Sequence, residues 1–456
     1  MPIPFDNTYA RLPESMFTQL SPTPVAKPEI IKVNTDLAAS LGISEADLTA
    51  EVLSGNQIPE GASPLAQLYA GHQFGNWNPQ LGDGRAILLG EVNGFDIQLK
   101  GSGRTPYSRG GDGRSWLGPV LREYLLSEAM YAMGVPTTRA LAAVTTGEEV
   151  YRETPLPGAI FTRVASSHIR VGTFQIYAAR GMKDELQALC DHAIARHYPD
   201  AKGPEDLLER VISAQAKLFS KWVWRGGSHG VMNTDNCAIS GETIDYGPAA
   251  YLDVYDPDKV FSSIDQTGRY AFNNQPRIAI WNLAQLATAL IPLMPDEKEA
   301  IEVFTQNVNR FPDIYQEEWL KTFGAQLGLT SARETDVDFI QSLLTLMAQS
   351  GSDFTQTFAA LGTEKARDNF IDRDALDEWE KGWLARNPDN ALMKTANPRV
   401  IPRNHKVEET IAAGVEGDFA PFHKMLAAVT DPFQENEEYE RAPSKEEEVT
   451  RTFCGT

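Results

Sequence analysis

Alternating apolar and polar positions predict a β-hairpin early in the chain. Residues 85–92 and 95–100 are rich in β-prone side chains, and the dipeptide Asn93-Gly94 stands between them. Asn-Gly between two such runs is a strong hairpin signal, because both residues tolerate the left-handed conformation of a tight turn. In the second run the apolar side chains occupy the odd positions, so Lys100 is predicted to lie on the opposite face of the strand.

A glycine-rich segment at residues 101–114 follows the hairpin, and helical spacing follows the glycines. Apolar residues between Leu117 and Leu125 fall on one stripe at intervals of three and four, which predicts a helix. This helix is expected to carry Glu123 and to end near Gly134.

Blocks of strand-like and helical pattern follow along the chain. Residues 137–178 have the pattern of strands and turns, Pro204 opens a helical pattern, and the chain beyond about residue 280 is mostly helix-like. Before the hairpin, residues 32–41 have the pattern of a short helix. The acidic stretch 434–449 has the composition of a mobile, solvated tail.

Strands first and helices afterwards favour an α+β fold with a small β-rich N-lobe and a larger helical C-lobe. Segments are added at both ends. The expected divisions are an N-terminal extension at 1–75, the N-lobe at 76–178, the C-lobe at 179–300, and a helical C-terminal extension with the acidic tail at 301–456.

Composition narrows the classes of partner. The chain carries 41 basic and 62 acidic side chains, a net charge of −21, which argues against a nucleic-acid binder because such proteins need a basic face. No stretch approaches the ~20 apolar residues that span a bilayer, and no secretory signal is recognisable. The three cysteines, Cys190, Cys237 and Cys454, are too few for a disulfide framework. We therefore expect a monomer in a reducing, cytoplasmic compartment.

Four residues in a fixed order point to ATP and Mg²⁺. Protein kinases bind ATP with a strand Lys paired to a helix Glu, and they bind Mg²⁺ with an Asn and the Asp of Asp-Phe-Gly. Lys100, Glu123 and Asn236 occur here in that order, and Asp245 follows Asn236 by nine residues as the first residue of Asp-Tyr-Gly. Lys neutralises phosphate oxygens, Glu fixes the Lys rotamer, and Asn and Asp supply hard oxygen ligands.

One position departs from the kinase pattern. Val231 stands where a kinase carries its catalytic aspartate, five residues before Asn236, and valine accepts no proton. Either the protein is inactive as a catalyst or another base serves. Asp235, adjacent to Asn236, is the candidate base; its other reading is a carboxylate of the metal shell or of a turn.

Three arginines are the second departure from the kinase pattern. Arg85 closes the sequence Gly-Asp-Gly-Arg, and Arg163 and Arg170 lie seven residues apart. Arginine is the preferred bidentate phosphate ligand, although scattered arginines are usually surface residues. If these side chains enter the same cleft as Lys100, they bury the terminal phosphates of ATP instead of presenting them for transfer.

Long motifs at residues 69–85, 99–114 and 229–236 closely resemble the selenoprotein O family, also called YdiU, and so do 243–248 and the C-terminal Thr-Phe-Cys-Gly-Thr. The resemblance runs over nearly the whole chain. It implies a protein-kinase-like bilobal fold that lacks the usual catalytic Asp, as here. It also implies an adenylyltransferase that binds ATP head-to-tail inverted relative to kinases and passes AMP to Ser, Thr or Tyr hydroxyls of proteins.

The resemblance assigns roles residue by residue. Asn236 and Asp245 would bind Mg²⁺ or Mn²⁺, Asp235 would be the general base, and Glu123 would pair with Lys100. The residues that it places on the nucleotide are Gly82, Gly84, Arg85, Lys100, Asp112, Gly113, Arg163 and Arg170, with Asp245 reaching it through the metal.

Two family features bear on the cysteines. Some members carry selenocysteine near the C terminus, where this chain has Cys454. Some bacterial members have a cysteine soon after the Asp-Tyr-Gly segment that could form a disulfide with the terminal one, and the matching position here is Phe261. We therefore expect Cys454 to be an ordinary terminal thiol.

Three functions remain open on the sequence. AMP transfer to protein hydroxyls is the leading hypothesis. Transfer of the γ-phosphate to protein or small-molecule hydroxyls is the second, and Val231 disfavours it. The third is a nucleotide-binding scaffold without turnover.

Overall fold

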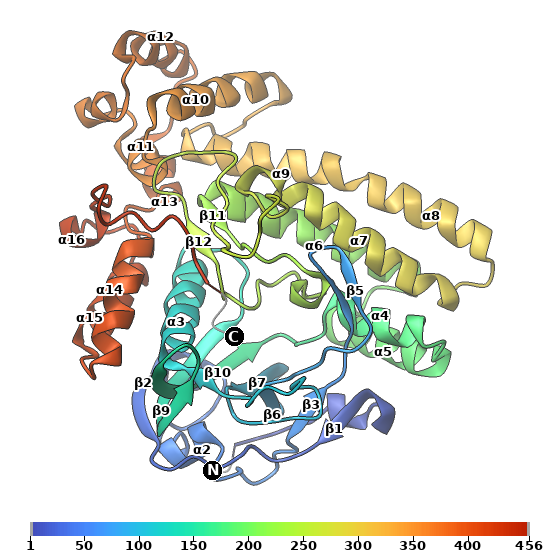
Figure 1. Ribbon diagram of the computed structural model, residues 1–456. Helices are drawn as coiled ribbons and strands as arrows, with labels where there is room; N and C mark the ends of the chain where they lie inside the picture. The colour runs from blue at the N-terminus through green and yellow to red at the C-terminus, as the bar shows by residue number, and fades with distance from the viewer. Residues whose placement is uncertain (1–2, 454–456) are drawn as a thin grey trace.

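The structure, a computed structural model, describes residues 3–453, and it is an α+β fold with a mainly antiparallel sheet and many helices (Figure 1). The main sheet has the strand order β1-β3-β6-β7-β10-β9-β2, and β8 also pairs with β10. Its strands are β1 Phe17–Gln19, β2 Glu29–Val33, β3 Leu65–Gln67, β6 Ala86–Val92, β7 Phe95–Lys100, β8 Ser115–Trp116, β9 Arg139–Tyr151 and β10 Pro155–Ala165. Two small hairpins lie outside it, β4 Gly71–Gln73 with β5 Asn76–Asn78, and β11 Gly227–Ser228 with β12 Ala250–Tyr251.

The predicted hairpin is strands β6 and β7. Asn93 and Gly94 connect them with φ values of 50° and 82°, the left-handed geometry that their sequence favours. Ile97 and Leu99 are buried on one face of β7 and Lys100 lies on the other, as the alternation predicts.

Helices cover both faces of the sheet. On one face, α3 (Leu117–Ala132) packs against β9 and β10 through residues such as Leu121 and Leu125. On the other face, the short helices α1 (Thr35–Ser40) and α2 (Ala50–Ser54) cover the apolar side of β7. The helix predicted at 32–41 therefore begins later than expected, because residues 29–33 pair with β9 as strand β2.

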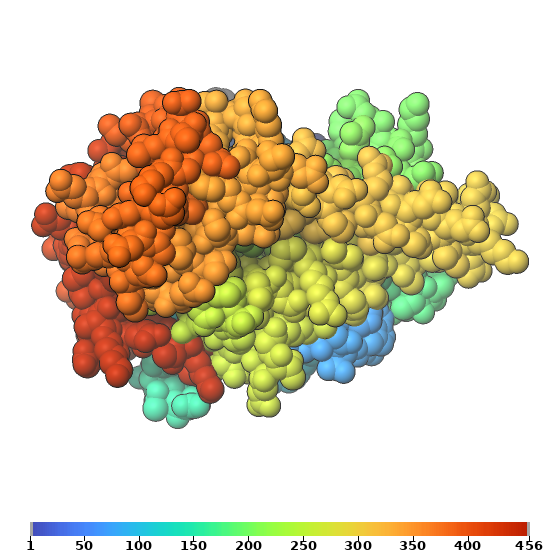
Figure 2. Space-filling view, turned by 90° about the horizontal axis from the view of Figure 1, so that it is seen from above, coloured from blue at the N-terminus to red at the C-terminus, as the bar shows by residue number. Residues whose placement is uncertain are grey.

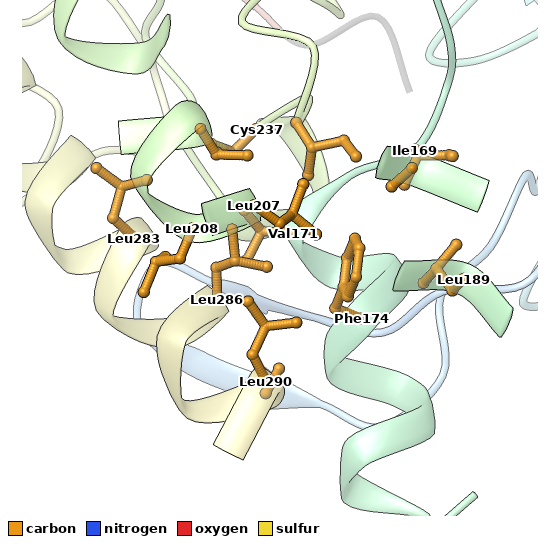
Figure 3. Close-up of a cluster of buried hydrophobic side chains, with 14 of the residues drawn as sticks. Ile169, Val171, Phe174, Leu189, Leu207, Leu208, Cys237, Leu283, Leu286 and Leu290 are labelled. Atoms are coloured by element: carbon orange, nitrogen blue, oxygen red, sulfur yellow. The ribbon is translucent and has the colours of Figure 1, made fainter. Parts of the chain in front are cut away.

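A helical core follows the sheet. Its helices are α4 Val171–Ala179, α5 Lys183–His197, α6 Pro204–Trp224, α7 Gln275–Leu290, α8 Glu297–Asn309 and α9 Phe311–Gln326. Figure 3 shows apolar side chains that pack together between the four helices α4, α5, α6 and α7, one from each being Phe174, Leu189, Leu208 and Leu286. Pro204 begins α6 as predicted. The prediction of strands and turns throughout 137–178 is wrong at its end, since α4 is a helix whose residues are buried on every side, which hides the helical period.

The C-terminal helices form two groups at one end of the molecule, and the α8–α9 pair extends toward the other end (Figure 2). The first group, α10 Val337–Ser350, α11 Phe354–Ala360, α12 Arg373–Leu384 and α13 Asn390–Ala396, encloses its own apolar cluster with α9. The second, α14 Asn404–Val415 and α15 Ala420–Val429, packs on the outer side of α3, where the rings of Tyr124 and Phe422 lie 5.5 Å apart. Short 3₁₀ turns occur at Tyr9–Arg11, Glu14–Met16, Glu45–Asp47, Thr234–Asn236 (η4), Phe272–Asn274, Ile291–Leu293, Glu334–Asp336 and Glu364–Asn369.

The acidic stretch 434–449 is mostly exposed, as predicted, but it is attached to the body of the protein. Helix α16 (Glu437–Glu440) buries Tyr439, and Glu440 accepts two hydrogen bonds from Arg399 at 3.0 and 2.9 Å. Beyond it, the Thr452 backbone N–H donates to the carbonyl of Phe261 at 2.8 Å. The prediction of a mobile tail is therefore wrong for this stretch. Cys454 lies outside the described residues.

Among residues 3–453, no helix is long and apolar enough to cross a membrane.

Candidate active site

The centre of the site is the pair that the sequence singled out. Lys100 ends strand β7 and Glu123 lies on α3, and the Lys100 Nζ is 2.6 Å from the Glu123 Oε2. Both residues are buried. The alternation of β7 aims Lys100 away from the apolar core and toward α3, which explains how residues 23 positions apart meet.

Asp245 joins this pair from the chain segment after η4. Its φ of 64° is left-handed, an uncommon conformation for a residue with a side chain. The carboxylate accepts hydrogen bonds from Lys100 and from Arg163 Nη1, the latter at 2.7 Å, and Arg170 Nη2 lies 3.8 Å away. Burial acts to raise the pKa of Asp245, but the charges of Arg163, Lys100 and Arg170 hold that pKa well below its usual range.

Both arginines are inside the protein, which decides between the two readings that the sequence left open. Arg163 and Arg170 are each 1% exposed. Arg163 lies on β10 opposite Gln98 of β7, and it donates to the Gln98 Oε1 at 2.7 Å and to the Glu123 Oε1 at 3.1 Å. Arg170 lies 3.7 Å from Asp83. Three cations therefore meet three carboxylates in one buried cluster, which we call the charge cluster: Lys100, Arg163, Arg170, Glu123, Asp245 and Asp83.

Asp235 and Asn236 lie in the turn η4. The Gln73 Nε2 of hairpin β4–β5 donates to the Asp235 Oδ2 at 3.1 Å. The buried Oδ1 of Asp235 has no hydrogen-bond partner within residues 3–453. Burial raises the pKa of Asp235 to about 6. Asn236 donates from its Nδ2 to the carbonyl of Val231 at 3.0 Å, which leaves its amide oxygen available.

The glycine positions bring two backbone segments close together. A Cβ on Gly82 would lie 2.6 Å from the ring of Tyr107, and a Cβ on Gly84 would lie 2.9 Å from the Tyr107 carbonyl oxygen. Gly113 has a φ of 71°, and its Cβ would meet the backbone of Gly103 at 2.2 Å. Gly82 and Gly84 let residues 82–85 lie against the segment 101–114, and Gly113 lets that segment fold back on its own start at Gly103.

Asp112 and Arg85, two of the predicted nucleotide residues, lie in different surroundings. Asp112 is near the surface, where its carboxylate accepts a hydrogen bond from Arg152 at 2.8 Å. Arg85 precedes β6, and its carbonyl accepts from the Gly101 N–H at 2.7 Å, so its backbone lies next to the end of β7.

Comparison with known proteins identifies the family. A family model described as "Protein adenylyltransferase SelO" matches residues 1–430. The chain belongs to this family.

Several relatives of this SelO family member can be aligned with it over nearly the full length of both sequences. A protein of Roseobacter denitrificans is 61% identical over 99% of both chains. A protein of Ruegeria sp. strain TM1040 is 57% identical, covering 100% of this chain and 99% of its own, and one of Rhodopseudomonas palustris strain BisB18 is 52% identical over 99% of both. Each carries the name "Protein nucleotidyltransferase YdiU". The resemblance seen in the sequence is therefore confirmed: the chain is a nucleotidyltransferase, and ATP is its substrate.

Sequence reasoning missed several residues of this SelO site. Gln98 lies two positions before Lys100 on the same face of β7, so the alternation that placed Lys100 also contained Gln98. Asp83 lies between two predicted nucleotide glycines, and His168 lies between the two arginines. Gln73 carried no signal, because only the folded hairpin β4–β5 brings it to Asp235.

Gly113→Ala is expected to destabilise this protein more than Gly110→Ala. Both glycines have left-handed φ values, which cost about 1–2 kcal/mol for any other residue, but a Cβ on Gly110 meets nothing within 4 Å. At Gly113 the added atom also collides with the Gly103 backbone. Urea unfolding of the two variants measures the difference in the free energy of unfolding. Equal losses would mean that the close approach of Gly113 to the Gly103 backbone contributes nothing.

Proposed function

We propose that this protein transfers AMP from ATP to Ser, Thr or Tyr hydroxyls of proteins, with ATP inverted relative to its pose in kinases and Mg²⁺ bound. The observation that carries the proposal is the convergence of Lys100, Arg163 and Arg170 on one partly buried carboxylate, that of Asp245.

The depth of these groups supports the inverted pose. Arg163 and Arg170 are almost completely buried, whereas the Asp245 side chain is 24% exposed. Buried cations attract the most highly charged end of ATP, its terminal phosphates. With the γ-phosphate held there by Lys100 and the two arginines, the α-phosphate faces the acceptor. Gly82, Gly84, Arg85, Asp112 and Gly113 complete the nucleotide contacts.

The oxygen donors suit Mg²⁺. Asp245 supplies a carboxylate whose depressed pKa keeps it ionised, and Asn236 supplies an amide oxygen while its nitrogen is engaged by Val231. Mg²⁺ is commonly held by one or two protein oxygens with phosphates and water completing the shell. Consistent with that, no group of three or more His, Cys, Asp and Glu side chains is arranged for a metal within residues 3–453. When bound, the cation neutralises charge on the phosphates and on the leaving diphosphate.

Asp235 is the proposed general base. Its free Oδ1 accepts the proton of the acceptor hydroxyl, the hydroxyl oxygen forms a bond to the α-phosphorus, and the bond from that phosphorus to the oxygen bridging to the β-phosphate breaks. Diphosphate leaves with the electron pair of that bond. Lys100, oriented by Glu123, and the two arginines hold the departing group.

We propose that two lobes hold this chemistry. Strands β6 to β10 with α3, within 76–178, form the N-lobe of a kinase-like pair, 179–300 is the C-lobe, and 1–75 and 301–456 are extensions, of which 1–75 adds strands β1, β2 and β3 to the same sheet. Lys100, Glu123 and Arg163 then come from the N-lobe, and Asp235, Asn236 and Asp245 from the C-lobe.

ATP labelled at the α- or the γ-phosphate tests the proposal. The purified protein is incubated with each nucleotide, Mg²⁺ and protein acceptors. Label on protein from the α position supports AMP transfer. Label from the γ position supports a kinase, the alternative favoured by the Lys100–Glu123 pair. Tight ATP binding without transfer supports a scaffold, and either of these two outcomes overturns the proposal.

The pH dependence of transfer is expected to follow Asp235. A base must be ionised, and burial raises the pKa of Asp235 to about 6. Below that pH the carboxylate is protonated, so kcat/KM is expected to fall about tenfold per unit. Initial rates between pH 4.5 and 8 check this, with circular dichroism at each pH as the control for folding. A flat profile through this range contradicts the assignment.

A further inference from the structure

A buried histidine links the two arginines of the charge cluster. The His168 Nε2 lies 3.2 Å from the Arg163 Nε, and the backbone carbonyl of His168 accepts from the Arg170 Nη1 at 2.8 Å. His168 is 0% exposed. It therefore contacts both cations without facing the space beside Asp245.

The other ring nitrogen of His168 is held by a carboxylate. Its Nδ1 lies 2.9 Å from the Asp96 Oδ2, and its backbone N–H donates to the same oxygen at 2.9 Å. Asp96 is fixed in turn by Arg196 of α5, at 2.8 Å from the Asp96 Oδ1. Burial lowers the pKa of His168 to about 4, so the ring is neutral at physiological pH.

These contacts fix the tautomer. Arg163 Nε–H is a donor only, so the Nε2 facing it must accept, and the single ring proton lies on Nδ1, where it donates to Asp96. The ring thereby fixes the Nε end of the guanidinium. The Nη1 of Arg163 is left on the Asp245 side, 2.7 Å from its Oδ1, and the Nη2 on the Gln98 side.

We propose that His168, oriented by Asp96, is a positioning residue that sets the direction of the Arg163 guanidinium toward the terminal phosphates of ATP. The proposal rests on the proposed function, because it takes the inverted nucleotide pose as its starting point. Neither residue touches substrate; both act through Arg163. The His168 ring orients this arginine in the way that a hydrogen-bonded carboxylate or carbonyl orients a metal-bound histidine.

Two substitutions separate the two ring nitrogens. His168→Asn retains an amide N–H near the Nδ1 position and loses the acceptor that faces Arg163. His168→Gln places an amide oxygen near the Nε2 position and loses the donor to Asp96. His197→Asn is the matched control, because it removes a partly buried imidazole that bonds Ser167 and contacts neither Arg163 nor Arg170.

The readout is the dissociation constant of ATP and of AMP with Mg²⁺, measured by calorimetry on variants whose folding is verified by circular dichroism. For His168→Asn we expect the ATP constant to rise about tenfold, as when an orienting partner is lost. The AMP constant should be unchanged, because AMP lacks the phosphates that reach Arg163. His168→Gln should weaken ATP binding less than His168→Asn does, because it keeps the acceptor and loses only the contact with Asp96. His197→Asn should bind ATP as the wild type does. Wild-type ATP affinity in His168→Asn, or equal losses in the Asn and Gln variants, would overturn the proposal.

Arg163→Ala distinguishes a failure of this inference from a failure of the proposed pose. If Arg163→Ala weakens ATP but not AMP while His168→Asn is unaffected, the pose stands and His168 has no positioning role. If Arg163→Ala weakens both nucleotides equally, the pose itself is wrong.

A measurement on the wild-type protein covers the case in which a variant does not fold. Long-range ¹H–¹⁵N NMR spectra report the tautomer of each histidine. We expect His168 to be neutral with its proton on Nδ1 between pH 6 and 8. A proton on Nε2 would leave that nitrogen unable to accept from Arg163, and the proposal would fail.

Discussion

Alanine in place of Asp245 is expected to lower AMP transfer by about a thousandfold or more, because one change removes the proposed metal ligand and the common partner of three cations. Without this carboxylate, Lys100, Arg163 and Arg170 face one another with less opposing charge. Breaking a buried ion pair by removing one partner costs about 3–5 kcal/mol, so the free energy of unfolding should fall as well.

Separate measurements are needed for these two effects. Transfer of α-label is measured at a temperature at which circular dichroism shows the variant folded. Asp245→Asn keeps the shape and one oxygen ligand, so it should lose less activity than the alanine variant. Asp253→Asn is a control for stability, since Asp253 pairs with the buried Arg403 far along the chain and belongs to no proposed catalytic group. Full α-label transfer by Asp245→Ala would show that this residue binds no essential metal.

Asparagine in place of Asp235 is expected to reduce kcat by about 10²- to 10⁴-fold, the range that general bases contribute, while leaving ATP affinity within a few fold. The substitution keeps the size of the side chain and an oxygen for the Gln73 amide, which donates to the Oδ2 at 3.1 Å. It removes the ability to take up a proton. Initial-rate kinetics with labelled ATP measure kcat and KM separately.

Asp265→Asn is the matched control for Asp235→Asn. Asp265 is also a buried aspartate, but it accepts backbone N–H bonds from Arg269 and Tyr270 and faces no proposed substrate group. Its replacement should change kcat little. Normal transfer by Asp235→Asn would return Asp235 to its structural reading, a carboxylate that holds the hairpin β4–β5 over η4.

The local elements of the N-terminal half were predictable from the sequence for physical reasons. The hairpin β6–β7 and the helix α3 have strong periodic patterns and distinct turn residues, and the structure places them as expected. The face of Lys100 followed from alternation alone. Helix α4 was missed because residues 171–177 are all buried, Thr173 and Gln175 included, so no exposed polar face gives the sequence a helical period.

The connections across the site were not predictable in the same way. That Arg163 meets Gln98 depends on the register between β10 and β7, which no local pattern sets. The contact of Gln73 with Asp235 joins segments 162 residues apart. The acidic stretch was misjudged because its composition indicates only that it is well solvated. Its attachment to the body of the protein depends on the buried Tyr439 and on the Arg399–Glu440 ion pair.

The charge cluster has a consequence for the order in which small molecules enter. Asp245 is held by three cations, so a metal ion that approaches alone meets a carboxylate already engaged and positive charges that repel it. Phosphate groups that draw those cations away release Asp245. By thermodynamic linkage, nucleotide and metal then strengthen each other's binding by the same factor. With Asp245 as the proposed metal ligand, the site would recognise the metal–nucleotide complex as a unit and discriminate against either component alone.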